Sequence, residues 1–247
     1  MSDHENLIRA LRNLDEKPPD TATRSEKKSY SESMSAIVAL VIGDSLRNRG
    51  TRNLVQALPS APGVSGGSGA ERRMAGGIGD KKVDVTWATE ESGLITAFSI
   101  KCINFRDRRS NNFQKNLINR RGDMLVEAVT LHRRFPYSTL VGLMIFDEDA
   151  NHDDTPRRRT TFRNAHERLR LFTGRTDPAG RDEQYEGFYV GLVSASPDLA
   201  TITFARAGEP ESRLDLDEIL AETLPVIAER NDDSYSFDGT RLRRRPR

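Results

Sequence analysis

The chain has 247 residues, of which 36% are hydrophobic and 30% charged, and its 38 basic and 37 acidic side chains leave a formal net charge of +1. This length allows a sizeable hydrophobic core, and near-neutrality indicates no partner unless the charges segregate along the chain. The single cysteine, Cys102, excludes an intramolecular disulfide and a cysteine-rich zinc site and predicts a reducing compartment, the cytoplasm. We expect no secretory signal, because the N-terminus lacks a basic segment followed by an apolar stretch. We also expect no membrane span, because the longest apolar run, residues 36–42, is far shorter than the roughly 20 residues that a span needs.

The N-terminal quarter of the chain predicts two helices. A short amphipathic helix over residues 7–14 is expected within a loose N-terminal arm, residues 1–28. Ser29 or Ser31 is predicted to cap a second helix that continues to about Leu46. Two prolines and seven glycines then predict a long loop over residues 59–80, with a short strand or helix near residues 70–74.

The next segment is predicted to be a β-hairpin. Runs rich in β-branched and aromatic residues, 82–87 and 94–104, flank a turn. Two registers of antiparallel pairing are open, one with Asp84 opposite Ser99 and the other with Asp84 opposite Lys101. Because side chains alternate with a period of two, either register places these three side chains on one face.

The rest of the pattern predicts helices and strands in alternation. A helix is expected over residues 111–134, with Gly122 as a candidate kink, and residues 138–146 read as a strand buried on both faces. A helical crossover between the hairpin and this strand makes the two flanking strands parallel and implies a mixed sheet with helices on both faces. A solvated loop over residues 147–159, a helix over 162–172, strands over 187–193 and 200–205 and a helix over 216–229 complete the prediction.

This order of elements, with Asp84 on one strand and Ser99-x-Lys101 on the next, resembles the core of the PD-(D/E)XK nuclease superfamily, in particular type II restriction endonucleases. The resemblance implies an α/β fold with a mixed sheet, a restriction-endonuclease-like αβββαβ core and a C-terminal α/β elaboration. It divides the chain into four parts: the N-terminal arm (1–28), the nuclease core (29–147), an elaboration packed on the core (148–240) and a basic tail (241–247).

The resemblance also implies hydrolysis of phosphodiester bonds with Mg²⁺, for which Mn²⁺ can substitute. Asp84 is the expected central metal ligand, and the backbone carbonyl of Ile100 is a further candidate, because hard Mg²⁺ prefers oxygen ligands. Lys101 would orient the attacking water, stabilise the developing charge or act as the base, and all three roles are open at this point.

The second metal-binding carboxylate is not evident, because Ser99 stands where the family usually has Asp or Glu. Some restriction enzymes with Ser-x-Lys carry this acid in the following helix, but the corresponding position here is the neutral Gln114. Glu32 is a candidate, although Ser29-x-x-Glu32 also reads as a helix capping box. Glu71, in the glycine-rich loop, is the other candidate.

Basic residues cluster directly after the hairpin. Residues 106–121 hold six basic side chains and one acid, and residues 241–247 hold five arginines. Such a run is often a solvated helix face, but its position beside the hairpin favours contacts with phosphates and base edges. The predicted nucleic-acid-binding residues are Arg106, Arg108, Arg109, Lys115, Asn119, Arg120 and Arg121.

From these features we predict a cytoplasmic endonuclease of restriction or defence type that acts on duplex DNA. A homodimer is expected, because a two-fold related pair of sites matches a palindromic duplex. Two alternatives are open. One is a nuclease-like fold that binds nucleic acid without cleaving it, which Ser99 and Gln114 favour, and the other is a nuclease that acts on RNA or in repair.

Overall fold

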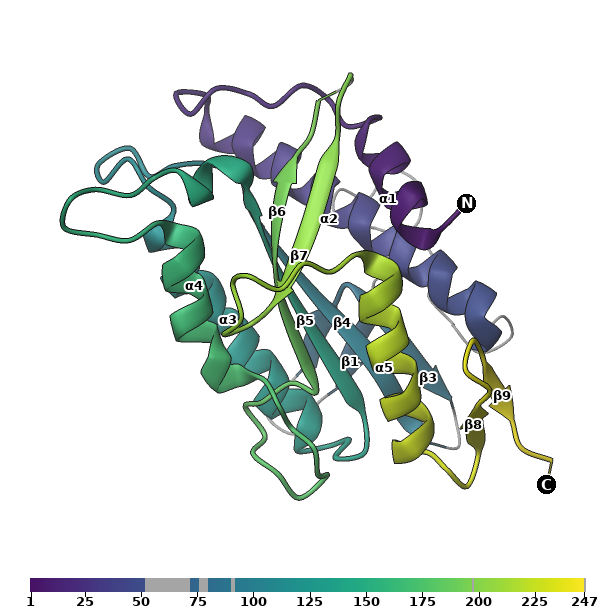
Figure 1. Ribbon diagram of the computed structural model, residues 1–247. Helices are drawn as coiled ribbons and strands as arrows, with labels where there is room; N and C mark the ends of the chain where they lie inside the picture. The colour runs from purple at the N-terminus through teal and green to yellow at the C-terminus, as the bar shows by residue number, and fades with distance from the viewer. Residues whose placement is uncertain (52–71, 76–79, 90–91, 197, 247) are drawn as a thin grey trace.

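The structure is a computed structural model that describes residues 1–51, 72–75, 80–89, 92–196 and 198–246. Its centre is a five-stranded mixed sheet in the order β3-β4-β5-β6-β7, with helices on both faces (Figure 1), as the sequence predicted at this level. The central pairs β4-β5 and β5-β6 are parallel, and the outer pairs are antiparallel. The strands are β3 (Val85–Thr89), β4 (Gly93–Ile103), β5 (Thr139–Asp147), β6 (Gly187–Ser194) and β7 (Thr201–Arg206).

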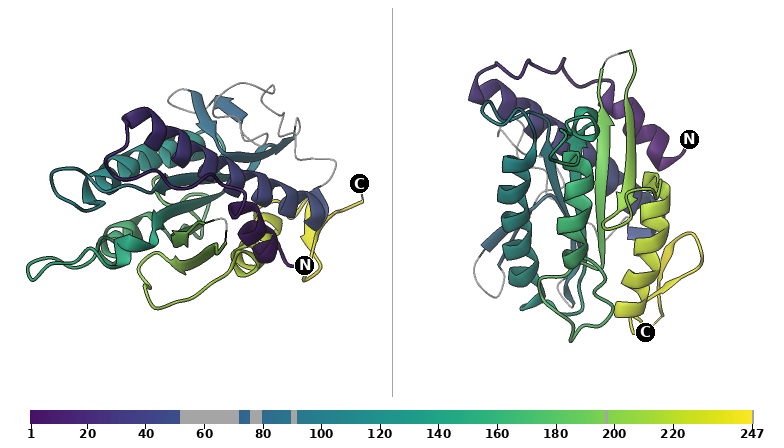
Figure 2. Two further views of the ribbon diagram at one scale, coloured as in Figure 1. Left: turned by 90° about the horizontal axis from the view of Figure 1, so that it is seen from above. Right: turned by 60° about the vertical axis from the view of Figure 1, so that its left-hand side comes forward.

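Two apolar layers cover the sheet, and alternate residues of β4 contribute to each. Phe98 and Ile100 belong to the layer under α1, α2 and α5, whereas Ala97 and Ile103 belong to the layer under α3 and α4. The right-hand view of Figure 2 shows the sheet between α3 and α5. The helices are α1 (Asp3–Leu11), α2 (Arg24–Leu46), α3 (Gln114–His132), α4 (Thr161–Leu169) and α5 (Leu216–Arg230), with the short turns η1 (Arg47–Thr51), η2 (Glu148–Asn151) and η3 (Arg170–Phe172).

The parallel pairing of β4 and β5 follows from the crossover helix between them, as predicted. Helix α3 runs without interruption through Gly122, so the candidate kink is not present. Every residue of β5 is buried, because helices cover the sheet on both sides of this central strand.

The edge of the sheet at β4 positions the candidate site. Strand β3 pairs with β4 only as far as Val85 opposite Phe98, and Asp84 separates β3 from β2 (Asp80–Val83), which pairs with β1 (Arg72–Ala75) instead. In the described part of the chain, residues 99–103 of β4 therefore have a strand partner on one side only, which is β5.

The N-terminal segment departs from the prediction. Helix α2 begins at Arg24, where Thr23 and Glu26 form a reciprocal capping box, so the box predicted at Ser29 and Glu32 is wrong and both residues lie inside the helix. The arm is not loose either, because α1 packs on α2 and α5 with Leu7 and Leu11 fully buried.

Two C-terminal predictions also change. The loop after β5 is not simply solvated, since it contains η2 and the buried Asp153. The predicted basic tail contains a strand, β9 (Leu242–Arg244), which pairs with β8 (Tyr235–Phe237) and buries Leu242.

Most of the glycine-rich loop, residues 59–80, lies outside the described residues. Among the helices that the structure describes, none is both long and apolar enough to cross a bilayer.

Candidate active site

Asp84 lies at the open edge of β4. Its Oδ2 accepts a hydrogen bond of 2.7 Å from the backbone N–H of Ile100, so the carboxylate occupies the place that a neighbouring strand would take. Continuing the β3-β4 register by one residue puts Asp84 opposite Ser99, which is one of the two registers predicted. Because the N–H and C=O of one strand residue point to the same side, the Ile100 carbonyl faces this edge too.

Lys101 lies between two carboxylates. Its Nζ is 3.6 Å from Asp84 Oδ2 and 3.7 Å from Oε2 of Glu127, which projects from the middle of α3. The Glu127 side chain is 7% exposed, compared with 17% for Lys101 and 22% for Asp84. The three side chains thus join the sheet edge to the crossover helix, and the charge pair compensates part of the cost of burying Glu127.

The two carboxylates control the charge of Lys101. Burial by itself would lower the pKa of this lysine, but the negative charges of Glu127 and Asp84 outweigh burial and raise the pKa above its ordinary value. Lys101 is therefore a cation at neutral pH in the arrangement seen here. The three roles predicted for Lys101 all stay open, because a cation bound by the same carboxylates would oppose their effect on its pKa.

Sequence reasoning missed Glu127. The position predicted for a relocated acid is Gln114, whose side chain donates to Thr161 Oγ1 at 3.4 Å, toward α4. A signal was present, because Glu127 follows Met124 by three residues and precedes Leu131 by four, which places it on the buried face of α3. A carboxylate on an apolar helix face is a feature to examine for function.

The other predicted ligands lie elsewhere. Ser99 is 2% exposed and buried in the sheet. Glu32 lines the cleft described below, but its carboxylate is 3.6 Å from Lys28 Nζ, one turn earlier on α2. Glu71 is outside the described residues.

Asp84 and Lys101 line a cleft of about 1030 Å³ between α2, the end of β4 and the start of α3. Of the predicted nucleic-acid-binding residues, all but Arg121 line this cleft. The lining is mainly basic, with nine basic and three acidic side chains. The basic residues are Arg24, Lys27, Lys28, Lys101, Arg106, Arg108, Arg109, Lys115 and Arg120, and the acidic residues are Glu32, Asp84 and Asp107.

The rim of the cleft is held by the segment between α1 and α2. The backbone N–H of Arg106 donates to Asp20 Oδ1 at 3.1 Å, and Arg108 Nη2 donates to the Thr21 carbonyl at 3.0 Å. On the other side, Lys115 Nζ donates to Asp107 at 3.0 Å, and this contact together with two backbone N–H donors lowers the pKa of Asp107 to about 2. These contacts connect the rim to the segment between α1 and α2 and to the start of α3.

Sequence reasoning also missed the basic wall on α2. Arg24, Lys27, Lys28 and Ser31 recur at the spacing of one helix face, and all line the cleft. The prediction that α2 began at Ser29 or Ser31 left three of these four residues outside the helix, so their common face was not seen.

The described residues contain no group of three or more His, Cys, Asp and Glu side chains placed to hold a metal ion. The oxygen donors that the structure does gather are the carboxylates of Asp84 and Glu127 and the edge-facing carbonyl of Ile100. Comparison with protein-family models, with curated proteins and with solved structures found no match.

Proposed function

We propose that the protein is a divalent-metal-dependent nuclease that hydrolyses phosphodiester bonds of DNA in the cleft between α2 and α3. The observation that carries the proposal is the arrangement of Asp84 and Glu127 around Lys101, together with the cleft that Asp84, Lys101 and eight further basic side chains line. Basic walls attract a phosphate backbone, and carboxylates beside a lysine are the groups that metal-assisted phosphate chemistry needs.

The donor set fits a hard divalent cation. Mg²⁺ takes oxygen ligands, keeps several waters and is commonly held by one or two protein carboxylates plus substrate phosphate, so a cluster of three acids is not required. Asp84 and Glu127 would hold the ion, with the Ile100 carbonyl as a further ligand. When bound, such an ion lowers the pKa of a coordinated water and neutralises charge on the phosphate.

The protein's own residues supply the remaining functions. The Lys101 ammonium would stabilise the negative charge that develops on the phosphoryl oxygens and hold the attacking water by a hydrogen bond. Arg24, Lys27 and Lys28 from α2, and Arg109 and Arg120 from the other wall, would bind flanking phosphates.

The order of elements also supports the proposal. Helix α2 is followed by β1, by β2 and β3, which Asp84 alone separates, and then by β4, α3 and β5. With β2 and β3 counted as one interrupted strand, this order is similar to the αβββαβ core of the PD-(D/E)XK nucleases, which the motif Asp84 with Ser99-x-Lys101 resembles. In this proposal Glu127 supplies the acid that Ser99 lacks. The homodimer, the restriction or defence setting and the cytoplasm stay predictions.

Nicking of supercoiled plasmid with Mg²⁺ or Mn²⁺ tests the proposal. We expect Asp84→Asn, Lys101→Met and Glu127→Gln each to reduce the rate by about 100-fold or more, because each removes a group that acts on the developing charge. Glu32→Gln tests the other candidate carboxylate, and Glu229→Gln, an exposed site on α5, is the matched control.

The outcomes separate the alternatives. Loss of nicking in Glu127→Gln with normal nicking in Glu32→Gln identifies Glu127 as the second carboxylate, and the reverse identifies Glu32. Tight DNA binding by the wild type without metal-dependent nicking contradicts a nuclease and favours a binding protein. Cleavage of RNA, but not of duplex DNA, would assign a different substrate.

A further inference from the structure

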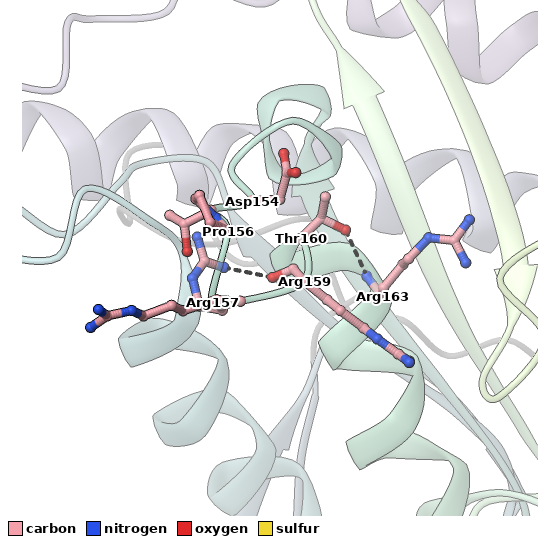
Figure 3. Close-up of a pocket in the computed structure, with 8 residues that line it drawn as sticks. Asp154, Pro156, Arg157, Arg159, Thr160 and Arg163 are labelled. Atoms are coloured by element: carbon pink, nitrogen blue, oxygen red, sulfur yellow. Dashed lines mark hydrogen bonds between the residues drawn. The ribbon is translucent and has the colours of Figure 1, made fainter.

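A second basic surface lies outside the cleft, on the turn that precedes α4. Residues 154–160 and Arg163 surround a shallow cavity of about 430 Å³ (Figure 3), and we call this surface the arginine loop. It carries Arg157, Arg158, Arg159 and Arg163 against one lining acid, Asp154. Nothing in the proposed catalytic arrangement uses these side chains.

Asp153 fixes the arginine loop in place. Its side chain is fully buried and accepts hydrogen bonds from the backbone N–H of Thr161 at 2.6 Å and of Phe113 at 3.4 Å, at the starts of α4 and α3. Arg158 donates to the Asp153 carbonyl and also, at 2.9 Å, to the Arg159 carbonyl. The turn is therefore tied to two helix N-termini, and Arg158 is used to hold it.

The other three arginines point outward. Figure 3 shows Arg157, Arg159 and Arg163 directed away from one another, so their guanidinium groups do not converge on one small anion. The Arg159 and Arg163 side chains are 71% and 52% exposed. Arg163 has an acidic neighbour, Glu211, at 2.8 Å, and Arg159 has Glu167 at 4.0 Å, whereas Arg157 has no ion pair with any described residue. Diverging, exposed guanidinium groups suit successive phosphates of a polymer better than a single ion.

The arginine loop lies close to residues that line the cleft. Arg106, which lines the cleft, pairs with Asp149 of η2 at 3.2 Å, and Gln114 at the start of α3 contacts Thr161 at the start of α4. The N-termini of α3 and α4 are thus neighbours. The basic rim of the cleft is next to the start of α3, and the arginine loop is next to the start of α4. Figure 1 shows both loops on the same side of the sheet's upper end.

We propose that the arginine loop binds the phosphate backbone of duplex DNA beyond the segment held in the cleft, so that one duplex contacts both surfaces. This inference rests on the proposed function, because it extends the same substrate. It assigns the loop to positioning long DNA and gives it no part in the bond-breaking step.

Salt-dependent binding without added metal, measured by fluorescence anisotropy, tests the inference. The variant Arg157→Ala/Arg159→Ala/Arg163→Ala is compared with the control Arg12→Ala/Arg133→Ala/Arg181→Ala, which removes three exposed charges elsewhere. Each lost phosphate contact lowers the slope of log K against log salt by about 0.9. The first probe is a duplex of about 24 base pairs, roughly 80 Å long. On this duplex we expect the magnitude of the slope of log K against log salt to be about 2 to 3 smaller for the loop variant than for the wild type, and its affinity to be about 10- to 100-fold weaker. On a hairpin with about 6 base pairs we expect no change.

The results distinguish this inference from the function on which it rests. Equal affinities of the loop variant and the control on the long duplex would overturn the inference, even if nicking still depended on Asp84 and Lys101. Equal losses in both variants would indicate a general charge effect and overturn it as well. Loop-dependent binding of inorganic phosphate alone would show an enclosed single-anion site instead. If the wild-type protein binds neither the long duplex nor the short hairpin, both proposals are contradicted.

Discussion

Burying the charged side chains of Glu127 and Lys101 costs solvation free energy, which other interactions of the fold must offset. A buried carboxylate loses its hydration, and its attraction to one ammonium group at 3.7 Å returns only part of that free energy. Such a group on the packed face of α3 is retained most readily where it has a chemical task, which is why the nicking experiment centres on it.

His166 is a second buried titratable side chain, and it makes stability depend on pH. Its Nδ1 lies 3.1 Å from the Arg206 carbonyl, and its ring packs edge-on against Phe162. Burial lowers the pKa of His166 from 6.5 to about 4, because the charged ring would be poorly solvated. The folded protein therefore disfavours the protonated imidazole.

We expect this histidine to destabilise the fold in mild acid. Between pH 6.5 and 4 the unfolded chain takes up the proton first, so the free energy of unfolding falls as the pH falls, by about 2 to 3 kcal/mol at pH 4.5. His166→Gln keeps an amide donor for the Arg206 carbonyl and removes the titration. Urea unfolding at pH 7 and pH 4.5 should show a smaller acid loss in the variant, and parallel losses would disprove the assignment.

The sequence predicted part of the site because part of it is local. Asp84 and Lys101 follow from the period-two alternation of one hairpin, which adjacent strands preserve. Glu127 belongs to a helix whose rotation over the sheet is set by packing of Leu117, Met124 and Leu131, and that packing is a long-range property. The contact between Lys101 and Glu127 therefore could not be predicted from the pattern of the strands alone.

At the scale of elements, Asp153 acts on two helices at once. The partial positive charges at the starts of α3 and α4 both face this buried carboxylate, and such a position stabilises a negative charge. The apparently irregular stretch after β5 is thus an ordered connection between helices.

Removing the Asp153 carboxylate should loosen both helix starts. Asp153→Ala leaves the N–H groups of Phe113 and Thr161 without their side-chain acceptor and removes the carboxylate that pairs with Arg158, and we expect the free energy of unfolding to fall by about 3 kcal/mol. Chemical denaturation measures this loss, and Asp154→Ala, at the exposed neighbouring position, is the control. A loss equal to that of the control would contradict the role of Asp153.

Helix boundaries were the least predictable part of the elements. Thr23-x-x-Glu26 and Ser29-x-x-Glu32 have the same spacing, and the first is the true start of α2 because no residue between the two breaks the helix. By contrast, the strands β5, β6 and β7 and the helix α5 were predicted to within about two residues, since their apolar patterns are continuous.

At the scale of the whole molecule, a buried charge network joins elements from both halves of the chain. Glu186, just before β6, accepts from Arg175 at 3.1 Å and from Arg230 at the end of α5 at 3.2 Å, and its other oxygen accepts from the Leu140 N–H at 2.7 Å. His132 at the end of α3 lies 3.4 Å away. One carboxylate thus links α3, β5, β6 and α5.

Glu186→Gln should destabilise the entire fold. The substitution leaves the buried guanidinium groups of Arg175 and Arg230 without a counter-charge, and breaking a buried ion pair from one side costs about 3 kcal/mol or more. Thermal unfolding should show one cooperative transition at a lower temperature, with Glu229→Gln unchanged. A variant as stable as the wild type would show that the network contributes little.

Exposed backbone at the border of a sheet can recruit an extended segment from another molecule, which is a common route to aggregation. At the side of β4 where residues 99–103 have no strand partner among the described residues, Asp84 accepts from one such N–H group and puts a charge where an incoming strand would lie. A charge at this position disfavours edge-to-edge pairing of strands, so replacing the carboxylate that we assign to catalysis with an apolar β-branched residue would be expected to impair solubility along with activity.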